Sequence, residues 1–148
     1  MQNEVNLRKL DNREYSLIID TINQDPLLKE TFLGERNTVS RLLNTDYAAF
    51  IKVKDQVVGF LMLVMNEKEN VYEIDMGILQ KYRNCGYGTE ALKIIKDIIL
   101  NNNLDICIQV KKINNPAKKS IQNNGFINFK SDENHEYYKL DSNNVKSK

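Results

Sequence analysis

The residues best suited to chemistry in this chain lie in the segment 80–89, which reads QKYRNCGYGT and stands between an expected strand and an expected long helix. The N-terminus of a helix presents unpaired backbone N–H groups at the positive end of the helix dipole, which suits a phosphate. Gly86 and Gly88 let the backbone approach a ligand closely. Arg83 adds a fixed positive charge and Thr89 a hydroxyl group. The segment predicts a phosphate site; an ordinary strand-to-helix turn with two glycines is the alternative.

Two common phosphate motifs do not match this segment. The dinucleotide fingerprint needs a third glycine and an early position in the chain, and both are missing. A P-loop needs Gly-Lys followed by Ser or Thr, and no such sequence follows the glycines. A different phosphate-binding architecture is therefore expected.

Hydrophobic periodicity predicts the elements that position this segment. A strand period over 71–79 puts Glu73, Asp75 and Gly77 on one face. An amphipathic helix follows the segment and stops at the asparagines 101–103. The other expected elements are a strand near 5–10, helices near 11–22, 25–32 and 38–43, a hairpin of 50–53 and 57–65 around a turn at 54–56, a strand at 106–110, a helix at 116–123 capped by Gly125 or Asn124, and a hairpin of 126–130 and 137–140. This order predicts an α/β (α+β) fold with a mixed sheet and helices on its faces.

Composition narrows the class of protein. The 148 residues predict one domain, placed at 1–141, and a disordered tail at 142–148. Lys and Arg number 21 against 20 Asp and Glu, so no basic excess predicts a nucleic-acid partner. The longest apolar run, 60–65, is far below the roughly 20 residues of a membrane span, and no secretory signal is visible. Two cysteines and one histidine predict no metal site and a reducing, cytoplasmic location.

The glycine segment also resembles a known family, the GNAT family of N-acetyltransferases. The family's pyrophosphate loop has Arg or Gln, two residues, Gly, one residue, and Gly or Ala. This chain has Arg83-x-x-Gly86-x-Gly88, followed by Thr89-Glu90-Ala91-Leu92. A second family signal follows the next strand: Asn114, Ala117 and the pair Gly125-Phe126. The resemblance covers about Val5 to Leu140.

The resemblance implies a mostly antiparallel sheet with a splayed parallel pair, helices on both faces, and an acetyl-CoA site without a metal. In the family, the backbone near Met76, Ile78 and Leu79 pairs with the pantetheine arm. Asn114 and Ala117 lie where the helix after the next strand contacts the cysteamine end. The N–H groups that hold the pyrophosphate correspond here to Arg83, Asn84, Cys85, Gly86, Tyr87, Gly88 and Thr89.

Acyl transfer to an amine needs a group that removes the amine proton. Glu73 and Asp75 precede the loop on one strand face, where the family often keeps an acidic residue, and either is a candidate base. Solvated carboxylates or ion pairs with nearby lysines are the alternative. A bulge in the strand would change which carboxylate faces the acceptor.

The family's usual general acid is a tyrosine four residues before the glycine of the Gly-Phe pair, and this chain has Ile121 there. Ser120, Tyr137, Tyr138 or solvent are the alternatives for protonating the thiolate. Cys85 near a helix N-terminus is a possible nucleophile, but no histidine stands nearby in sequence.

The sequence thus predicts an acetyl-CoA-dependent N-acetyltransferase in which a primary amine attacks the thioester directly. The acceptor is open between a small-molecule amine and a protein N-terminus, and the protein is expected as a monomer or homodimer. A non-catalytic acyl-CoA-binding module is the alternative, favoured by Ile121. A nucleotide-binding interaction domain is a further alternative.

Overall fold

The computed structural model describes residues 4–35 and 37–140. The chain divides into two compact units, one formed by Met1–Val64 and Asp75–Tyr87 and the other by Met65–Ile74 and Gly88–Lys148. The tail expected at 142–148 lies outside the described residues. The single domain expected at 1–141 stays a prediction.

The first unit is built on an antiparallel ladder of three strands, β1 (Val5–Lys9), β2 (Thr45–Val53) and β3 (Gln56–Asn66). The chain turns between β2 and β3 in only two residues, because Gln56 already pairs with Val53. Lys54 adopts a positive φ of 55° at this turn, as tight hairpin turns require. The expected turn at 54–56 is thus one residue too long.

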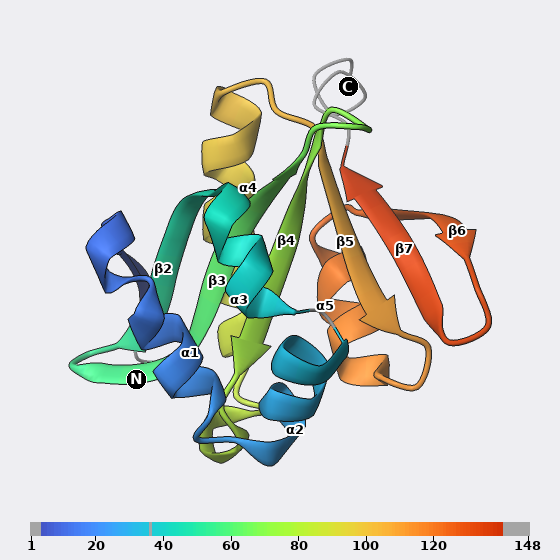
Figure 1. The fold of residues 1–148 in the computed structure, drawn as a ribbon. Helices are drawn as coiled ribbons and strands as arrows, with labels where there is room; N and C mark the ends of the chain where they lie inside the picture. Colours follow the sequence, from blue (N-terminus) through green and yellow to red (C-terminus); the bar gives the residue numbers. More distant parts are fainter. Residues whose placement is uncertain (1–3, 36, 141–148) are drawn as a thin grey trace. The chain divides into compact units, whose positions relative to one another are not determined.

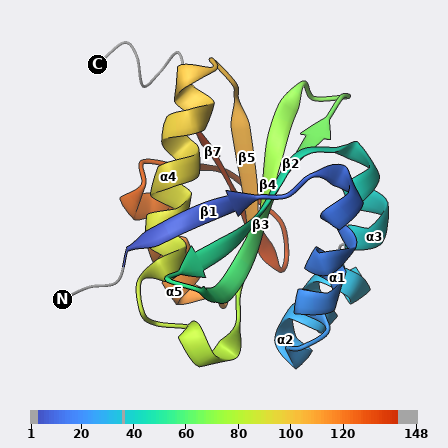
Figure 2. The ribbon, with the colours of Figure 1, turned by 90° about the vertical axis from the view of Figure 1, so that its left-hand side faces the viewer.

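Short helices lie between β1 and β2 in the first unit, and Figure 2 shows α1, α2 and α3 on one side of β2 and β3. Asp11, Asp25 and Asn37 cap these helices with their side chains, as short polar residues before helices do. The helical elements are η1 (Asn12–Glu14), α1 (Ser16–Ile22), α2 (Pro26–Leu28), the π-helical η2 (Lys29–Glu35), α3 (Thr38–Arg41) and η3 (Leu42–Asn44).

The core of the first unit joins these helices to the sheet. Alternate residues of β2 and β3 point toward the helices, as the period of two in a strand dictates. The buried cluster comprises Leu10, Ile18, Ile22, Leu28, Phe32, Ala48, Phe50, Phe60, Met62 and Val64. Phe32 and Phe60 meet edge to face, with ring centroids 5.0 Å apart.

The second unit contains β5 (Ile106–Lys111), β6 (Ile127–Ser131) and β7 (His135–Leu140), with β6 and β7 forming a hairpin beside β5 (Figure 1). Helix α4 (Tyr87–Asn101) buries one stripe, and α5 (Asn115–Asn123) buries Ile121. The stripe of α4 comprises Ala91, Leu92, Ile95 and Ile99.

One parallel pair distinguishes this sheet from a simple meander. Strand β4 (Val71–Ile78) pairs in parallel with β5 through Tyr72–Ile106, Glu73–Cys107 and Ile74–Ile108. The hydrogen-bonded order of the strands is β1-β2-β3-β4-β5-β7-β6. A mixed sheet with one parallel pair confirms the predicted fold class. No helix in the described part of the chain is both long and apolar enough to cross a membrane.

Candidate functional site

The residues expected at the site divide between the two units. The first unit holds Asp75, Met76, Ile78, Leu79, Arg83, Asn84, Cys85, Gly86 and Tyr87. The second unit holds Glu73, Gly88, Thr89, Asn114 and Ala117.

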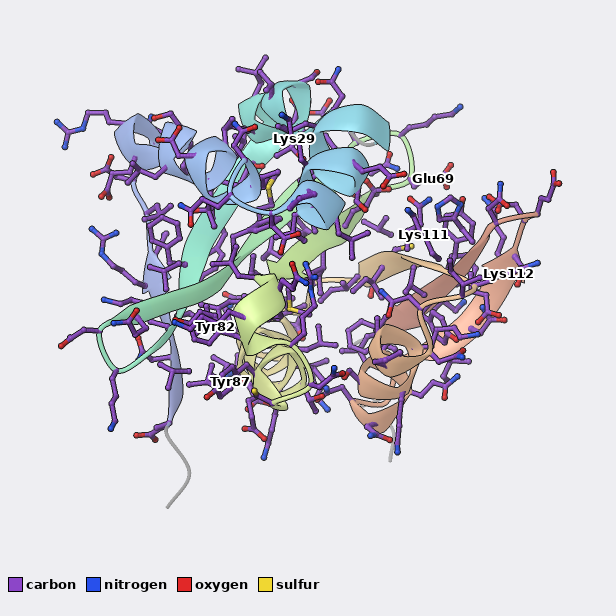
Figure 3. All side chains as sticks on the ribbon, turned by 90° about the horizontal axis from the view of Figure 1, so that it is seen from below. Lys29, Glu69, Tyr82, Tyr87, Lys111 and Lys112 are labelled. Atoms are coloured by element: carbon purple, nitrogen blue, oxygen red, sulfur yellow. The ribbon has the colours of Figure 1, made fainter. Side chains whose placement is uncertain are left out.

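The loop after β4 has a defined backbone shape. A 3-10 turn, η4 (Gln80–Tyr82), follows Leu79 and leads into extended Arg83. Asn84 and Gly86 then adopt positive φ angles of 64° and 82°. These are the residue types that tolerate the left-handed region best, so the sequence fits the turn that brings the chain into α4. Tyr82 and Tyr87 lie on the same side of this segment (Figure 3), with ring centroids 6.5 Å apart.

The backbone N–H groups of this loop are available to a ligand. Within the described ranges, none of the N–H groups from Asn84 to Thr89 donates a hydrogen bond. The last three open α4, a helix of 15 residues whose dipole adds positive potential at this end. A Cβ placed on Gly86 would meet nothing within 4 Å, so the space beside the loop is open. These features fit a pyrophosphate.

The side chain of Arg83 has a different role from the one expected. Its Nη2 atom lies 2.7 Å from Oδ2 of Asp25, and its Nε donates to the carbonyl of Ile78 at 2.9 Å. The charge expected to face a ligand is therefore neutralised inside the first unit. The cofactor loop stays a prediction; in this structure Arg83 holds the start of the loop through Asp25 and Ile78.

Asp25 is the residue that sequence reasoning missed. It was expected only to open a helix, and it does cap α2, with Oδ1 accepting from the N–H groups of Leu27 and Leu28. Oδ2 additionally accepts from the N–H of Gln80 at 2.8 Å. Burial alone would raise the pKa of Asp25, but the hydrogen bonds from Arg83, Gln80 and Leu28 outweigh it and hold the pKa below its usual value.

At the end of β4, the backbone groups of Leu79 already form hydrogen bonds within the protein. The N–H of Leu79 donates to the carbonyl of Val58 at 2.9 Å, and the carbonyl of Leu79 accepts from Tyr82. Leu79 therefore offers no N–H to a pantetheine arm while this bond holds. Met76 and Ile78 are the better candidates among the three expected residues.

Asp75 is deeply buried and firmly held. Both of its carboxylate oxygens accept from Arg41 of α3, at 2.7 Å to Nε and 3.1 Å to Nη2. Its side chain is 0% exposed and that of Arg41 is 24% exposed. A carboxylate in this position must disturb a bidentate ion pair before it can accept a proton.

Glu73, in the second unit, is more exposed than Asp75. Its side chain is partly exposed and accepts from Nδ2 of Asn66 at 3.3 Å. Its backbone stands in the parallel register opposite Cys107. Of the two candidate carboxylates, Glu73 reaches solvent more easily.

The start of α4 is tied to α5 within the second unit. Thr89 Oγ1 and Ser120 Oγ lie 2.6 Å apart. The buried amide of Asn124 donates to the carbonyls of Thr89 and Ser120, at 3.2 Å and 3.0 Å. The hydroxyl of Thr89 thus has a protein partner, and the helix start is held in place.

Asn114 has a capping role. Its Oδ1 accepts from the N–H of Ala117 at 3.2 Å, and Pro116 occupies the first turn of α5. Both residues expected after β5 are therefore joined by one N-cap hydrogen bond. Their local geometry follows from the sequence Asn-Asn-Pro-Ala.

These geometric features agree with a comparison of the whole sequence with protein families. The model of the acetyltransferase (GNAT) family matches residues 6–126. The chain belongs to this family. It is accordingly an N-acetyltransferase, and acetyl-CoA is the donor that the GNAT family uses.

Solved structures show the same GNAT fold. An acetyltransferase (GNAT family) from Bacillus anthracis has a TM-score of 0.71 and 18% identity, covering 97% of this chain and 98% of that chain. A dodecameric spermidine N-acetyltransferase from Vibrio cholerae has a TM-score of 0.70 and 15% identity, covering 95% of each chain. At these identities the likeness concerns the fold.

The position of the usual GNAT tyrosine is part of the core in this member. Ile121 is 3% exposed and lies in the last turn of α5. Its carbonyl accepts from the N–H of Phe126, while the N–H of Gly125 donates to Gln122. With Gly125 at a φ of 86°, this is a Schellman ending, which accounts for the Gly-Phe pair in structural terms.

The two tyrosines weighed as replacement acids both donate to carboxylates. The hydroxyl of Tyr138 donates to Glu136 at 2.6 Å, and burial, followed by this hydrogen bond, raises the pKa of Tyr138. The hydroxyl of Tyr137 donates to Asp132 at 2.7 Å. The hydrogen bond from Tyr137, with backbone N–H groups, lowers the pKa of Asp132 to about 2. Both hydroxyl protons are thus directed to carboxylates of the protein.

Cys85 is exposed in the loop, and its Sγ lies 3.6 Å from the carbonyl of Arg83. That contact supplies no base. Cys107 is half-buried on β5.

Proposed function

We propose that this acetyltransferase transfers the acetyl group of acetyl-CoA to a primary amine by direct attack of the amine on the thioester. The observation that carries the proposal is the row of N–H groups from Asn84 to Thr89 that donate to nothing within the described residues. Such a row at a helix N-terminus suits a pyrophosphate. The backbone of Met76 and Ile78 is proposed to pair with the pantetheine arm.

Glu73 is the better candidate for the general base. The attacking amine must lose a proton as the new C–N bond forms, and a partly exposed carboxylate can accept it. Asp75 is proposed instead to fix β4 through Arg41, since both of its oxygens are engaged. This divides the two carboxylates that the sequence leaves equivalent.

The thiolate is proposed to take its proton from solvent. Ile121 has no acidic group, and the hydroxyls of Tyr137 and Tyr138 donate to carboxylates. A thiol resembling cysteine has a pKa of ~8.5, so its thiolate is a fair leaving group without a dedicated acid. Turnover therefore does not require the tyrosine that this chain lacks.

The acceptor is proposed to be a small-molecule amine or a peptide N-terminus, and the location to be the cytoplasm. The spermidine N-acetyltransferase from Vibrio cholerae shares this fold, which supports including polyamines among the candidate acceptors. Monomer and homodimer remain the proposed states, although that relative is dodecameric.

Incubation with acetyl-CoA and a panel of polyamines, aminoglycosides, amino acids and N-terminal peptides tests the proposal. Release of CoA thiol that depends on one class of amine, matched by acetylated product, is the expected result. CoA binding without amine-dependent thiol release would support a non-catalytic module.

A further inference from the structure

The carboxylate of Asp25 is saturated by four N–H donors. Oδ1 accepts from the N–H groups of Leu27 and Leu28 at 3.0 Å and 3.2 Å. Oδ2 accepts from Gln80 at 2.8 Å and from Arg83 at 2.7 Å. The residue is 2% exposed, so these contacts replace water completely.

The two donors on Oδ2 stand at both ends of one short turn. Gln80 is the first residue of η4, and Arg83 is the residue that follows η4. Arg83 reaches back to the carbonyl of Ile78 as well, which closes the turn onto β4. A single buried oxygen thus fixes where the loop leaves the sheet and where its extended part begins.

The loop beyond Arg83 has little internal support. Within the described ranges, Asn84, Cys85 and Gly86 donate no backbone hydrogen bond, and two of these three residues have positive φ angles. The direction of their N–H groups is therefore set mainly by the ends of the loop, one of which Asp25 holds.

We propose that Asp25 is a positioning residue for the acetyl-CoA loop, acting through Gln80 and Arg83 to aim the loop N–H groups at the pyrophosphate. This inference rests on the proposed function of that loop. Asp25 touches no ligand in this account. It also couples the start of α2 to the loop, because Oδ1 and Oδ2 serve the two segments separately.

If Asp25 only stabilised the fold, its loss would weaken the binding of CoA and of pantetheine alike. If Asp25 positions the loop, its loss would weaken only the binding of a ligand that carries the pyrophosphate. Calorimetry with CoA and with pantetheine, which lacks the pyrophosphate, separates the two. Asp25→Asn turns one acceptor oxygen into an NH2 group among N–H donors and leaves Arg83 without its counter-charge. The affinity for CoA should fall ~10- to 100-fold, which is the usual loss when groups that bind a ligand are misplaced. The affinity for pantetheine should stay within about twofold.

Asp20→Asn is the matched control. It makes the same chemical change on α1, at an exposed position five residues earlier in the chain, and should leave both affinities unchanged. Equal losses for CoA and pantetheine in Asp25→Asn, or no loss for either, would overturn the proposal. Wild-type protein that fails to bind CoA would instead overturn the proposed function itself.

A second variant keeps the test open should Asp25→Asn unfold. Gln80→Pro removes the N–H that donates to Oδ2, together with an exposed side chain, and leaves Arg83 unchanged. Proline suits the first position of a helical turn, and Leu79 already has the extended ψ of 146° that a residue before proline needs. We expect the same selective loss of CoA affinity, about 10-fold or less; unchanged CoA affinity in a folded Gln80→Pro protein would overturn the proposal.

Discussion

The guanidinium of Arg41 donates hydrogen bonds to both carboxylate oxygens of Asp75, at 2.7 Å and 3.1 Å, and thereby links α3 to β4. The side chain of Asp75 is fully buried, so breaking this pair withdraws a compensating charge from a site that water cannot reach. This buried ion pair gives Asp75 a role in stability, whereas Glu73 is partly exposed. Stability and catalysis should therefore separate between the two carboxylates.

Glu73→Gln should lower kcat by ~10²- to 10⁴-fold, the usual contribution of a general base. The CoA affinity should change little, because Glu73 is not among the residues proposed to contact CoA and the substitution keeps the side chain's size. Steady-state kinetics and calorimetry measure the two quantities. A kcat within threefold of wild type, with an unchanged pH profile, would show that Glu73 is not the base.

Asp75→Asn should instead lower the free energy of unfolding by about 3 kcal/mol, the low end for breaking a buried pair because Arg41 is partly exposed. Chemical denaturation of this variant beside Glu73→Gln gives the comparison. If Asp75→Asn kept full stability and lost turnover, the roles of the two carboxylates would be exchanged.

Gly86→Val should remove most CoA binding while the fold survives. Gly86 has a φ of 82°, which a β-branched residue tolerates poorly, and the new side chain would fill the space beside the N–H groups. Gly125→Val is the matched control, because Gly125 has a φ of 86° and likewise has open space at its Cβ. Both variants should lose about 1–2 kcal/mol of stability. Equal CoA affinities in the two variants would argue against the loop as the pyrophosphate site.

Cys85→Ser should retain most acetyl transfer. The thiol contacts only a backbone carbonyl among the interactions that the structure describes for it, and the proposed reaction needs no covalent intermediate. Intact-mass analysis after incubation with acetyl-CoA alone should show no adduct on Cys85. An acetylated Cys85 that transfers its group to amine would indicate a ping-pong mechanism instead.

Tyr138→Phe should change the pH dependence of stability more than catalysis. The raised pKa of Tyr138 means that the folded state keeps its proton when the unfolded chain has begun to lose it. Wild-type stability from this residue is thus complete below pH ~10 and is lost as pH rises further. The free energy of unfolding, measured by urea denaturation near pH 8 and near pH 10.5, should fall less between these two pH values in Tyr138→Phe than in the wild type. An identical loss in both proteins would contradict the assigned environment.

The sequence predicts much of the fold because its signals are local. Asp11 and Asp25 indicate helix starts and Pro116 indicates the first turn of another helix, and η1, α2 and α5 begin there in the structure. Gly125 marks the end of α5 through its positive φ. The parallel pair of β4 and β5 was expected only from the family resemblance, and α4 supplies the crossover that such a pair requires.

The contacts that determine side-chain roles were less predictable because they join distant residues. Asp25 and Arg83 are 58 positions apart, and Arg41 and Asp75 are 34 apart. Nothing in the spacing of these residues announces a pair, and a charged residue beside a glycine loop reads naturally as a ligand contact. The position of Asp25 before Pro26 indicates a helix start but carries no sign of the contact with Arg83.

The most direct test of the account is a single-turnover reaction with acetyl-CoA labelled in its acetyl group, followed by mass spectrometry of the amine. Wild-type protein should give labelled acetyl-amine and one equivalent of free CoA, Gly125→Val should give the same, and Gly86→Val should give almost none. Labelled product formed equally by all three proteins, or by none while CoA still binds, would contradict the account.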